Sequence, residues 1–374
     1  MSKSTLLPKT IIHLWTLAGG RCEYKGCNKS LWKDSLSMNK MNAAYIAHIV
    51  SDSENGPRGD RIRSPKLAKD LNNLMLLCDE HHRKIDIEEK ENHSESVLTE
   101  MKKEHESRIS FLTALKPNNK VHIVVYGANI GIQGSPLDYQ DIVHAVLPNK
   151  YPANEYPIEL GISNSSFQDN EEIFWNVEIK NLERQFQEKV EKIKNQDAVK
   201  CFALFGLAPQ PLLIKIGTLF SDLYDVDVFQ KHREPSTWIW QDNFDFEGYT
   251  IEKPTELDGI PVLNLSLSAN ITDDRIEKLF NSKTSIWKIT HKNPNNDFLK
   301  SRDMLAKFRK TLRSFFDQVK FIHGQNAKLH VFPAMPVSAA VELGRIWMPK
   351  ADVKMIIYDQ NKKKQGFYKT IEII

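Results

Sequence analysis

Cysteine and histidine residues near the start of the sequence have the types and spacing of metal ligands. Cys22 and Cys27 are separated by four residues after a Gly-Gly pair, and Cys78 and His81 are separated by two. Three thiolates and one imidazole form the ligand set of a closed, tetrahedral structural zinc site. We therefore expect these four residues to bind Zn²⁺, whereas the distant Cys201 is expected to be an ordinary small buried residue.

His82 follows His81 directly and needs a different role. If residues 78 to 86 form a helix, neighbouring side chains point about 100° apart, so His82 faces away from the zinc and shares its face with Asp86 at i+4. Upstream, an apolar strand ends at His48 and a polar loop follows. A neutral imidazole can act as a general base, and a hard cation can stabilise charge on a phosphate. These side chains are therefore suited to phosphodiester hydrolysis.

The order of these residues resembles the HNH, or ββα-metal, nuclease fold. The matching segments are Ala47-His48-Ile49, Asn73-Leu74 through Cys78, and His82-x3-Asp86. The resemblance implies an α+β domain in which His48 is the general base and Asn73 orients the His48 ring. It also implies that His82 binds the catalytic divalent ion, Mg²⁺ or a similar cation.

One position departs from the HNH pattern. Many HNH enzymes carry Asp or His immediately before the base, where this sequence has Ala47. We take Asp86 as the substitute metal ligand, because a carboxylate suits a hard cation and lies one helical turn from His82. The alternative is that Asp86 only solvates a helix face.

A basic loop lies between the expected base and the expected metal-bearing helix. Residues 57 to 69 hold five basic side chains against one acid, Asp60. An isolated run of this kind is usually a solvated loop, but beside these histidines it could neutralise phosphates of a duplex. We predict DNA contacts by Arg58, Arg61 and Arg63. The whole chain gives no such signal, since 51 Lys and Arg against 48 Asp and Glu leave a net charge of +3.

The sequence divides near residue 118. A helix over residues 96 to 116 has one apolar stripe, made of Val97, Leu98, Met101, Ile109, Leu112 and Leu115. A turn at residues 116 to 119 follows, which predicts domains at 1–118 and 119–374. The second domain alternates strand-like and helix-like stretches, as α/β folds do. Its expected elements include a strand at 121–127 and helices at about 171–194 and 297–323.

An internal repeat lies within the second domain, around residues 201–240 and 328–367. Residues 205–217 (FGLAPQPLLIKIG) align without a gap with residues 332–344 (FPAMPVSAAVELG). The shared positions include Phe205 with Phe332, Pro209 with Pro336, and Gly217 with Gly344. Each copy predicts a strand, a proline turn, a helix, a glycine and a strand. Any two βαβ units look alike to some degree, but the absence of gaps favours a duplicated fold.

The repeat places two helix N-termini just after apolar strands, where α/β sheets bind anionic ligands. Two such sites facing one ligand would suit a molecule with two phosphates and approximate twofold character. Its bases could stack on tryptophans of the STWIWQ segment, although core packing is the ordinary role of such residues. The candidate ligand-binding residues are Gln210, Pro211, Lys231, Arg233, Trp238, Trp240, Ser338 and Arg345.

Residues from about 120 to the end resemble a SAVED domain. The resemblance rests on ALFGLAPQPLLIKIGTLF, VFQKHREPSTWIW and LHVFPAMPVSAAVELGRIWMPKADVKMIIYD. This family contains two fused CARF-like Rossmann units and senses cyclic oligonucleotides. An HNH domain joined to SAVED resembles an effector of bacterial anti-phage CBASS systems. The resemblance implies that a cyclic di- or trinucleotide binds SAVED, assembles a dimer or tetramer, and permits degradation of double-stranded DNA.

Two other functions remain open. A restriction-type HNH nuclease whose C-terminal domain reads modified DNA would need no messenger. A zinc-stabilised binding module would cut nothing, and Ala47 keeps this reading open. No run of eighteen apolar residues exists, so we expect no membrane span. Four cysteines without a secretory signal favour a cytoplasmic protein over a disulfide scaffold.

Overall fold

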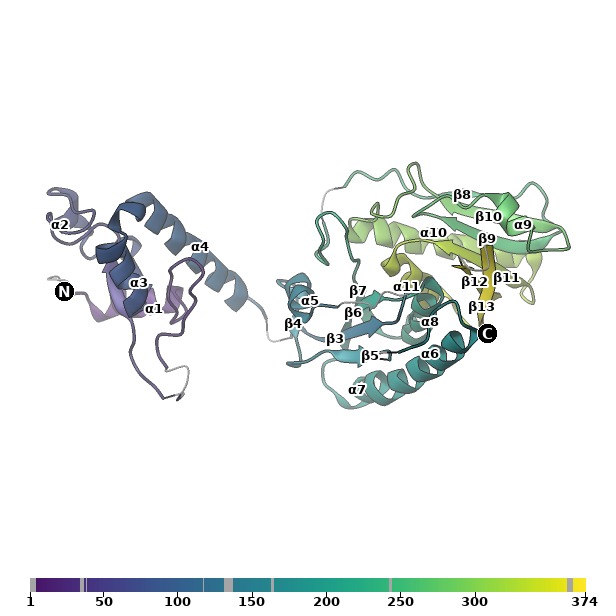
Figure 1. Cartoon of the computed structure of the whole chain (residues 1–374), viewed down its shortest axis with the longest axis horizontal. Helices are drawn as coiled ribbons and strands as arrows, with labels where there is room; N and C mark the ends of the chain where they lie inside the picture. Colours follow the sequence, from purple (N-terminus) through teal and green to yellow (C-terminus); the bar gives the residue numbers. More distant parts are fainter. Residues whose placement is uncertain are drawn as a thin grey trace. The chain divides into compact units, whose positions relative to one another are not determined.

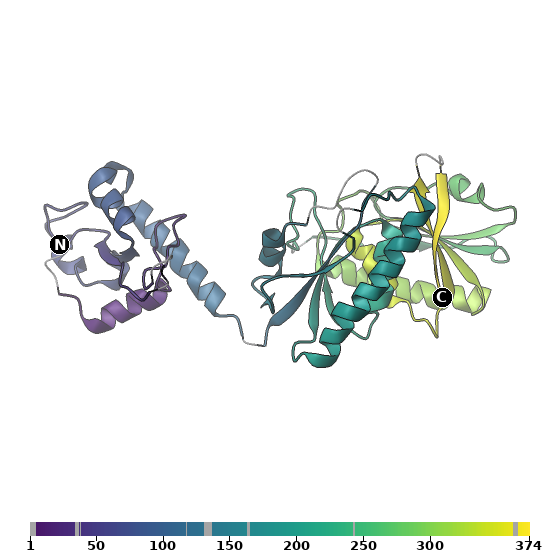
Figure 2. The ribbon, with the colours of Figure 1, turned by 60° about the horizontal axis from the view of Figure 1, so that its bottom comes forward.

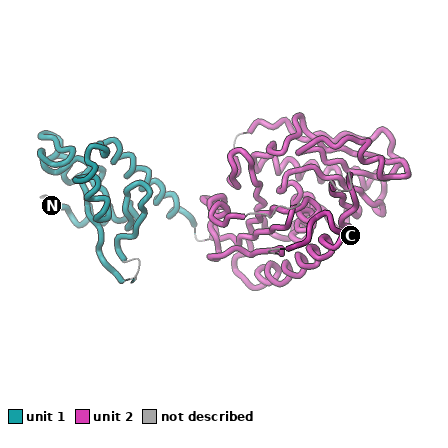
Figure 3. Tube along the Cα trace, viewed as in Figure 1, with its two compact units in different colours: residues 1–116 teal, residues 117–374 magenta. Residues whose placement is uncertain are grey.

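The chain forms two compact units, residues 1–116 and 117–374 (Figure 3). The structure is a computed structural model and describes residues 5–33, 37, 39–116, 118–130, 137–162, 165–241, 244–361 and 366–374. Each unit has a hydrophobic core of its own. Among the described residues, no helix combines the length and the apolar character needed to cross a lipid bilayer.

Unit 1 contains a pair of antiparallel strands followed by a short helix. Strand β1 (Tyr45–His48) pairs with β2 (Leu74–Leu77), so that His48 lies opposite Leu74. Helix α3 (Asp79–Arg83) begins directly after Cys78 and continues as a π-helical turn, η2 (Lys84–Glu88). The helix expected at residues 78–86 is therefore present, and it extends slightly further.

The remaining elements of unit 1 surround this pair of strands. They are α1 (Pro8–Leu17), α2 (Arg63–Leu67), the 3-10 turns η1 (Leu71–Asn73) and η3 (Lys90–Asn92), and α4 (Glu95–Thr113). Pro8 opens α1, where its missing N–H costs no hydrogen bond. The Ser94 side chain caps α4 by accepting from the Val97 amide. The proline and the serine cap therefore determine where these two helices begin.

The buried face of α4 differs from the predicted apolar stripe. Its buried residues are Leu98, Lys102 and His105, whereas Val97 and Leu112 are exposed. The Lys102 ammonium pairs with Glu106 and the His105 ring contacts the Ala18 carbonyl, at 3.0 Å. Polar side chains can occupy this face because each finds a partner there.

Unit 2 contains two sheets, and the strands of the first are all parallel. That sheet has the order β4–β3–β6–β7. Strand β5 also pairs with β3, at residues 124–126, whereas β4 pairs with residues 120–121. Its strands are β3 (Lys120–Gly127), β4 (Tyr151–Pro152), β5 (Ile158–Leu160), β6 (Cys201–Leu207) and β7 (Asp225–Val228). The strand expected at residues 121–127 is thus confirmed.

The second sheet has the order β13–β12–β11–β9–β10–β8. The four central strands are parallel and the two edge strands are antiparallel to their neighbours. The strands are β8 (Thr250–Glu252), β9 (Ile260–Ser266), β10 (Thr284–Thr290), β11 (Lys328–Ala334), β12 (Lys354–Asn361) and β13 (Gly366–Ile373). Sheets of this kind need helices on their faces, so the α/β prediction for this part of the chain is confirmed.

Helices accompany both sheets (Figure 1). They are α5 (Tyr139–Val146), α6 (Glu172–Gln185) with its continuations η4 (Phe186–Glu191) and α7 (Lys192–Gln196), α8 (Gln210–Phe220), α9 (Asp273–Glu277), α10 (Arg302–His323) and α11 (Val337–Ile346). Figure 2 shows α6 to α7 as one long helix, as expected for residues 171–194. Helix α10 begins five residues later than expected, because Ser301 caps it by accepting from the Met304 amide.

The two copies of the repeat meet through their helices. The first copy is β6, α8 and β7, and the second is β11, α11 and β12. Helix α8 packs on α11 and also contacts β12 and β13, while α11 contacts β6 and β7 of the first sheet. A Cβ atom placed on Gly217 would lie 2.9 Å from the Cα of Gly344, so the matched glycines lie at the helix crossing. The paired helices therefore join the two sheets.

Candidate functional site

The four predicted zinc ligands gather in unit 1. Cys22, Cys27, Cys78 and His81 place their ligand atoms within 4.8 Å of one another, which suits one tetrahedral metal ion. His81 Nδ1 lies 3.0 Å from Cys78 Sγ and 3.9 Å from Cys22 Sγ. Burial raises the pKa of the Cys22 and Cys78 thiols, so a bound cation is what would keep them as thiolates. Within the described residues, no second group of three or more such ligands gathers.

Aromatic and polar neighbours support this cluster, and sequence analysis did not find them. The Tyr24 ring stacks on His81 at a centroid distance of 4.1 Å, and its hydroxyl lies 3.0 Å from His93 Nε2. His93 Nδ1 lies 2.8 Å from the Glu89 carbonyl, which can only accept, so the proton of the Nδ1 tautomer points at that carbonyl and Nε2 can accept from Tyr24. These contacts hold the His81 ring in place.

Glu23 is a second residue that sequence analysis missed. Its carboxylate is buried, accepts from the Leu76 amide and lies 3.9 Å from Lys102 Nζ. Burial raises the pKa of Glu23 to about 7, and the Lys102 charge opposes that rise. Glu23 therefore joins the Cys22 segment to β2. Nothing in the sequence pattern separates it from an ordinary surface glutamate.

The His48 ring lies at the end of β1 and is only 8% exposed. Its Nε2 atom lies 3.0 Å from the Ala68 carbonyl. Because a carbonyl only accepts, a neutral His48 carries its proton on Nε2 and keeps the lone pair on Nδ1. A lone pair of this kind is what a general base needs.

The Asn73 side chain hydrogen-bonds to backbone groups and not to the His48 ring, which corrects the role expected for it. Its amide nitrogen donates to the Val50 and Leu67 carbonyls, at 2.9 and 3.2 Å, and its oxygen accepts from the Val50 amide at 2.8 Å. Asn73 therefore ties the segment after β1 to the end of α2. It positions the backbone around His48, while the Ala68 carbonyl orients the ring.

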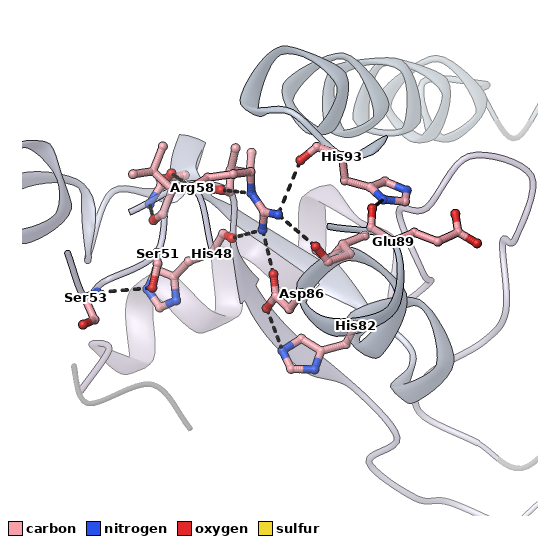
Figure 4. A network of polar contacts seen from close by, with 12 residues as sticks. His48, Ser51, Ser53, Arg58, His82, Asp86, Glu89 and His93 are labelled. Carbon is pink, nitrogen blue, oxygen red and sulfur yellow. Dashed lines mark hydrogen bonds and ion pairs between the residues drawn. The ribbon is translucent and has the colours of Figure 1, made fainter. Parts of the chain in front are cut away.

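His82 and Asp86 share one face of the helix, as the i+4 spacing predicts. His82 Nε2 lies 3.6 Å from Asp86 Oδ2, and the His82 ring stacks on Tyr45 at 4.9 Å. Figure 4 shows Asp86 between the His82 ring and the Arg58 guanidinium, which donates to Asp86 Oδ1 at 2.7 Å. Asp86 therefore does more than solvate a helix face. The π-helical turn that carries it is a local irregularity often found at functional sites.

The three arginines predicted to contact DNA have different surroundings. The Arg58 side chain is only 9% exposed and points inward, so it cannot serve as a phosphate contact. Arg63 is exposed and forms a two-contact ion pair with Glu95. Arg61 is exposed and keeps the role of a candidate DNA contact. The correction for Arg58 follows from its partners, which the charge pattern does not reveal.

Several predicted ligand residues of unit 2 are structural instead. Trp238 is 2% exposed and packs edge-on against Phe205. Ser338 is fully buried and donates to Gln230. Arg345 is buried, pairs with Glu342 and donates to three backbone carbonyls at and before β7. Pro211 and Trp240 are also buried.

The remaining candidates lie at the start of α8 and on the loop after β7. Gln210 opens α8, and its side-chain oxygen accepts from the Met335 amide just before α11. The two proline turns are therefore adjacent. Lys231 is partly exposed over the Trp238 ring, and Arg233 is exposed on the loop after β7. Gln210 thus lies at the adjoining helix N-termini, and a ligand contact by any of these three residues stays a prediction.

A separate cavity of about 850 Å³ opens at the carboxyl end of β3. Its lining includes Gly127, Asn129, Tyr156 and Lys189. None of the eight predicted ligand residues lines it. Sequence analysis missed this cavity because β3 lies outside the repeat.

Comparison with known proteins agrees with this architecture. Two largely parallel sheets joined through a duplicated helix pair define unit 2 as an α/β domain of two similar halves. The family model for SAVED, the "SMODS-associated and fused to various effectors sensor domain", matches residues 182–373, just over half of the chain. The protein belongs to the SAVED family.

Similar solved structures include SAVED/CARF-domain containing receptors named Cap4. The receptor from Acinetobacter baumannii with the cyclic trinucleotide 2'3'3'-cAAA has 15% identity and a TM-score of 0.45, over 74% of this chain and 55% of that one. The receptor from Moraxella osloensis has 13% identity and a TM-score of 0.41, over 75% and 61%. The matches thus cover less than two thirds of these receptors. No curated protein matches the sequence.

Proposed function

We propose that this protein is an anti-phage effector of the CBASS type, in which a cyclic oligonucleotide activates an HNH endonuclease. Membership of a family of sensor domains fused to effectors supports sensing by unit 2 and an effector role for unit 1. Two features of unit 1 carry the nuclease assignment. The Ala68 carbonyl contacts Nε2 of His48, so Nδ1 can accept a proton, and His82 and Asp86 form a separate pair that can bind a cation.

In this proposal, His48 accepts a proton from the water that attacks the phosphodiester. His82 and Asp86, with 3.6 Å between their facing atoms, are close enough to hold one divalent cation. Mg²⁺ usually binds proteins through one or two carboxylates and completes its shell with water and phosphate oxygens, so the Asp86 carboxylate is the kind of ligand that it prefers. When bound, the cation would stabilise charge on the phosphate and the leaving oxygen. Asp86 thereby takes the place of the acid missing at Ala47.

Zn²⁺ is the ion we assign to Cys22, Cys27, Cys78 and His81. Three soft thiolates and one imidazole favour zinc, and four protein ligands close the site. A closed site has a structural role. It would hold the Cys22 segment against the start of α3, from which His82 projects.

Plasmid cleavage tests the proposal. Full-length protein is incubated with plasmid, Mg²⁺ and a panel of cyclic di- and trinucleotides, and His48→Ala serves as the folded, inactive control. We expect cleavage only with a cyclic oligonucleotide. Cleavage that depends on DNA methylation and needs no messenger would support a restriction-type nuclease instead. No cleavage under any condition would support the third function, a zinc-stabilised binding module.

Activation should involve assembly into a dimer or tetramer. One site with one base cuts one strand, so cutting both strands needs a second site on the same duplex. If the messenger binds the assembled state more tightly, binding and assembly are reciprocal. Light scattering on His48→Ala should show a larger mass with ligand, because sensing and chemistry lie in different units. Activation at constant mass would favour rearrangement within an existing oligomer.

A further inference from the structure

Arg58 has a backbone conformation that side chains other than glycine rarely adopt. Its φ is +55°, in a tight loop where Ser51 donates to the Pro57 carbonyl. The following Gly59 has no room for a side chain, because a Cβ would lie 2.4 Å from the Ser53 carbonyl oxygen. Such a conformation at a non-glycine residue costs on the order of 1 kcal/mol or more and persists only where other contacts hold it.

The contacts that hold Arg58 come from three separate segments (Figure 4). Every polar partner of its guanidinium is an oxygen. The partners are Ile49 O at 2.6 Å, Asp86 Oδ1 at 2.7 Å, Ile85 O at 2.9 Å, and the carbonyls of His48 and His93 at 3.4 Å each. One planar group therefore joins the end of β1, the turn η2 and His93, which lies two residues before α4.

We infer that Arg58 is a positioning residue of the proposed nuclease site. The inference rests on the proposed function, since it assigns a role relative to His48 and to the His82–Asp86 pair. By binding the backbone beside His48 and the Asp86 carboxylate together, Arg58 sets the distance between base and cation site. Its hold on Oδ1 of Asp86 also leaves Oδ2 facing His82.

A lysine could not perform this role. The guanidinium is a rigid fork with five N–H donors, whereas an ammonium is a single point charge on a flexible stem. Arg58→Lys would keep the charge but could not reach the Ile49, Ile85 and Asp86 oxygens at once. Loss of alignment by about 1 Å can reduce turnover about 100-fold.

The first experiment measures cleavage by messenger-activated full-length protein at varied Mg²⁺. For Arg58→Lys we expect kcat to fall about 100-fold and the Mg²⁺ concentration at half-maximal rate to rise about tenfold. DNA affinity, measured in the inactive His48→Ala background, should not change. Arg83→Lys is the matched control, because Arg83 belongs to the same unit, is 59% exposed and makes only long ion pairs. Its activity should stay within about twofold of wild type.

A double-variant comparison separates positioning from an independent role. If Arg58 acts partly through Asp86, the losses from Arg58→Lys and Asp86→Asn should not multiply in the double variant. Weaker DNA binding by Arg58→Lys with unchanged Mg²⁺ dependence would show a phosphate contact and overturn the inference. Fully multiplicative losses would overturn it too, as would wild-type activity. Arg58→Gln replaces Arg58→Lys if the lysine variant does not fold, as judged by zinc content and melting.

A binding readout distinguishes failure of the inference from failure of the proposed function. If wild-type protein cuts no DNA with any messenger, the proposed function fails. Calorimetry with Mn²⁺ and zinc-loaded His48→Ala protein still tests Arg58. Adding Arg58→Lys should weaken Mn²⁺ binding about tenfold, because Arg58 orients the Asp86 ligand. Unchanged Mn²⁺ affinity would overturn the positioning role, and absence of Mn²⁺ binding in both proteins would overturn both proposals.

Discussion

Replacing Gly217 by alanine should destabilise unit 2, although the same change inside an ordinary helix is stabilising by about 1 kcal/mol. A Cβ atom on Gly217 would lie 2.1 Å from the Val341 carbonyl oxygen in α11. That oxygen belongs to the backbone, so no side-chain rotation relieves the contact. Helices α8 and α11 would have to separate by roughly 1 Å to restore an ordinary contact distance.

The expected magnitude follows from what that separation loses. A gap of 0.5–1 Å removes about a quarter to a half of each dispersion contact across an interface, and overpacking of buried sites costs about 1–3 kcal/mol, occasionally more. Both helices are largely buried, so we take the upper part of this range. After the gain in helix propensity is subtracted, Gly217→Ala should cost about 2 kcal/mol.

Gly344 provides an internal check, because it contacts the same crossing from the other side. Its Cβ would lie 2.0 Å from the Ile214 carbonyl oxygen. One separation of the helices relieves both contacts, so the double variant should cost clearly less than the two single variants together.

Urea unfolding of the full-length protein, followed by tryptophan fluorescence, measures these changes for unit 2. Gly366→Ala is the control, since no atom lies within 4 Å of the added Cβ. A more stable Gly217→Ala protein would refute the reasoning. So would full additivity of the two glycine replacements.

Three further predictions concern the metal cluster, the two histidines and a buried acid. Removal of zinc should unfold unit 1, because a site of this type contributes on the order of 10 kcal/mol that is also folding free energy; metal analysis and melting with a strong chelator measure this. His81→Ala should lower the melting temperature of unit 1, whereas His82→Ala should leave it nearly unchanged and weaken the divalent-ion dependence of cleavage. Burial raises the pKa of Glu178 to about 7. The protonated acid therefore contributes its full stability below about pH 4.5, and this contribution is lost as pH rises through 7. In Glu178→Gln, the fall in the free energy of unfolding between these pH values should be smaller by up to about 3 kcal/mol.

Each of these predictions has a contrary outcome. An unchanged melting curve in chelator, with no zinc in the purified protein, would remove the zinc assignment. Equal stability of the His81→Ala and His82→Ala proteins would contradict the separate roles of these histidines. An identical fall in stability between pH 4.5 and 7 for Glu178→Gln would show that another group titrates there.

Local sequence patterns were sufficient to predict several features. The metal-ligand cluster was predictable because Cys22 and Cys27, and likewise Cys78 and His81, are close in the sequence and so lie close in space. Only the approach of one pair to the other depends on the tertiary fold. The repeat was predictable because the two segments have the same hydrophobic pattern and matching glycines in the sequence. The i+4 spacing of His82 and Asp86 was enough to place both on one helical face.

Contacts between distant segments were decided by tertiary structure alone. In the sequence, Arg58 is one of five basic residues in a loop, but the fold turns it inward toward oxygens that lie up to 35 positions further along the chain. Trp238 and Arg345 have residue types suited to ligands, yet packing buries both. Periodicity specifies which residues face a core, whereas the partner of a polar group depends on which segments the completed fold brings within hydrogen-bonding distance.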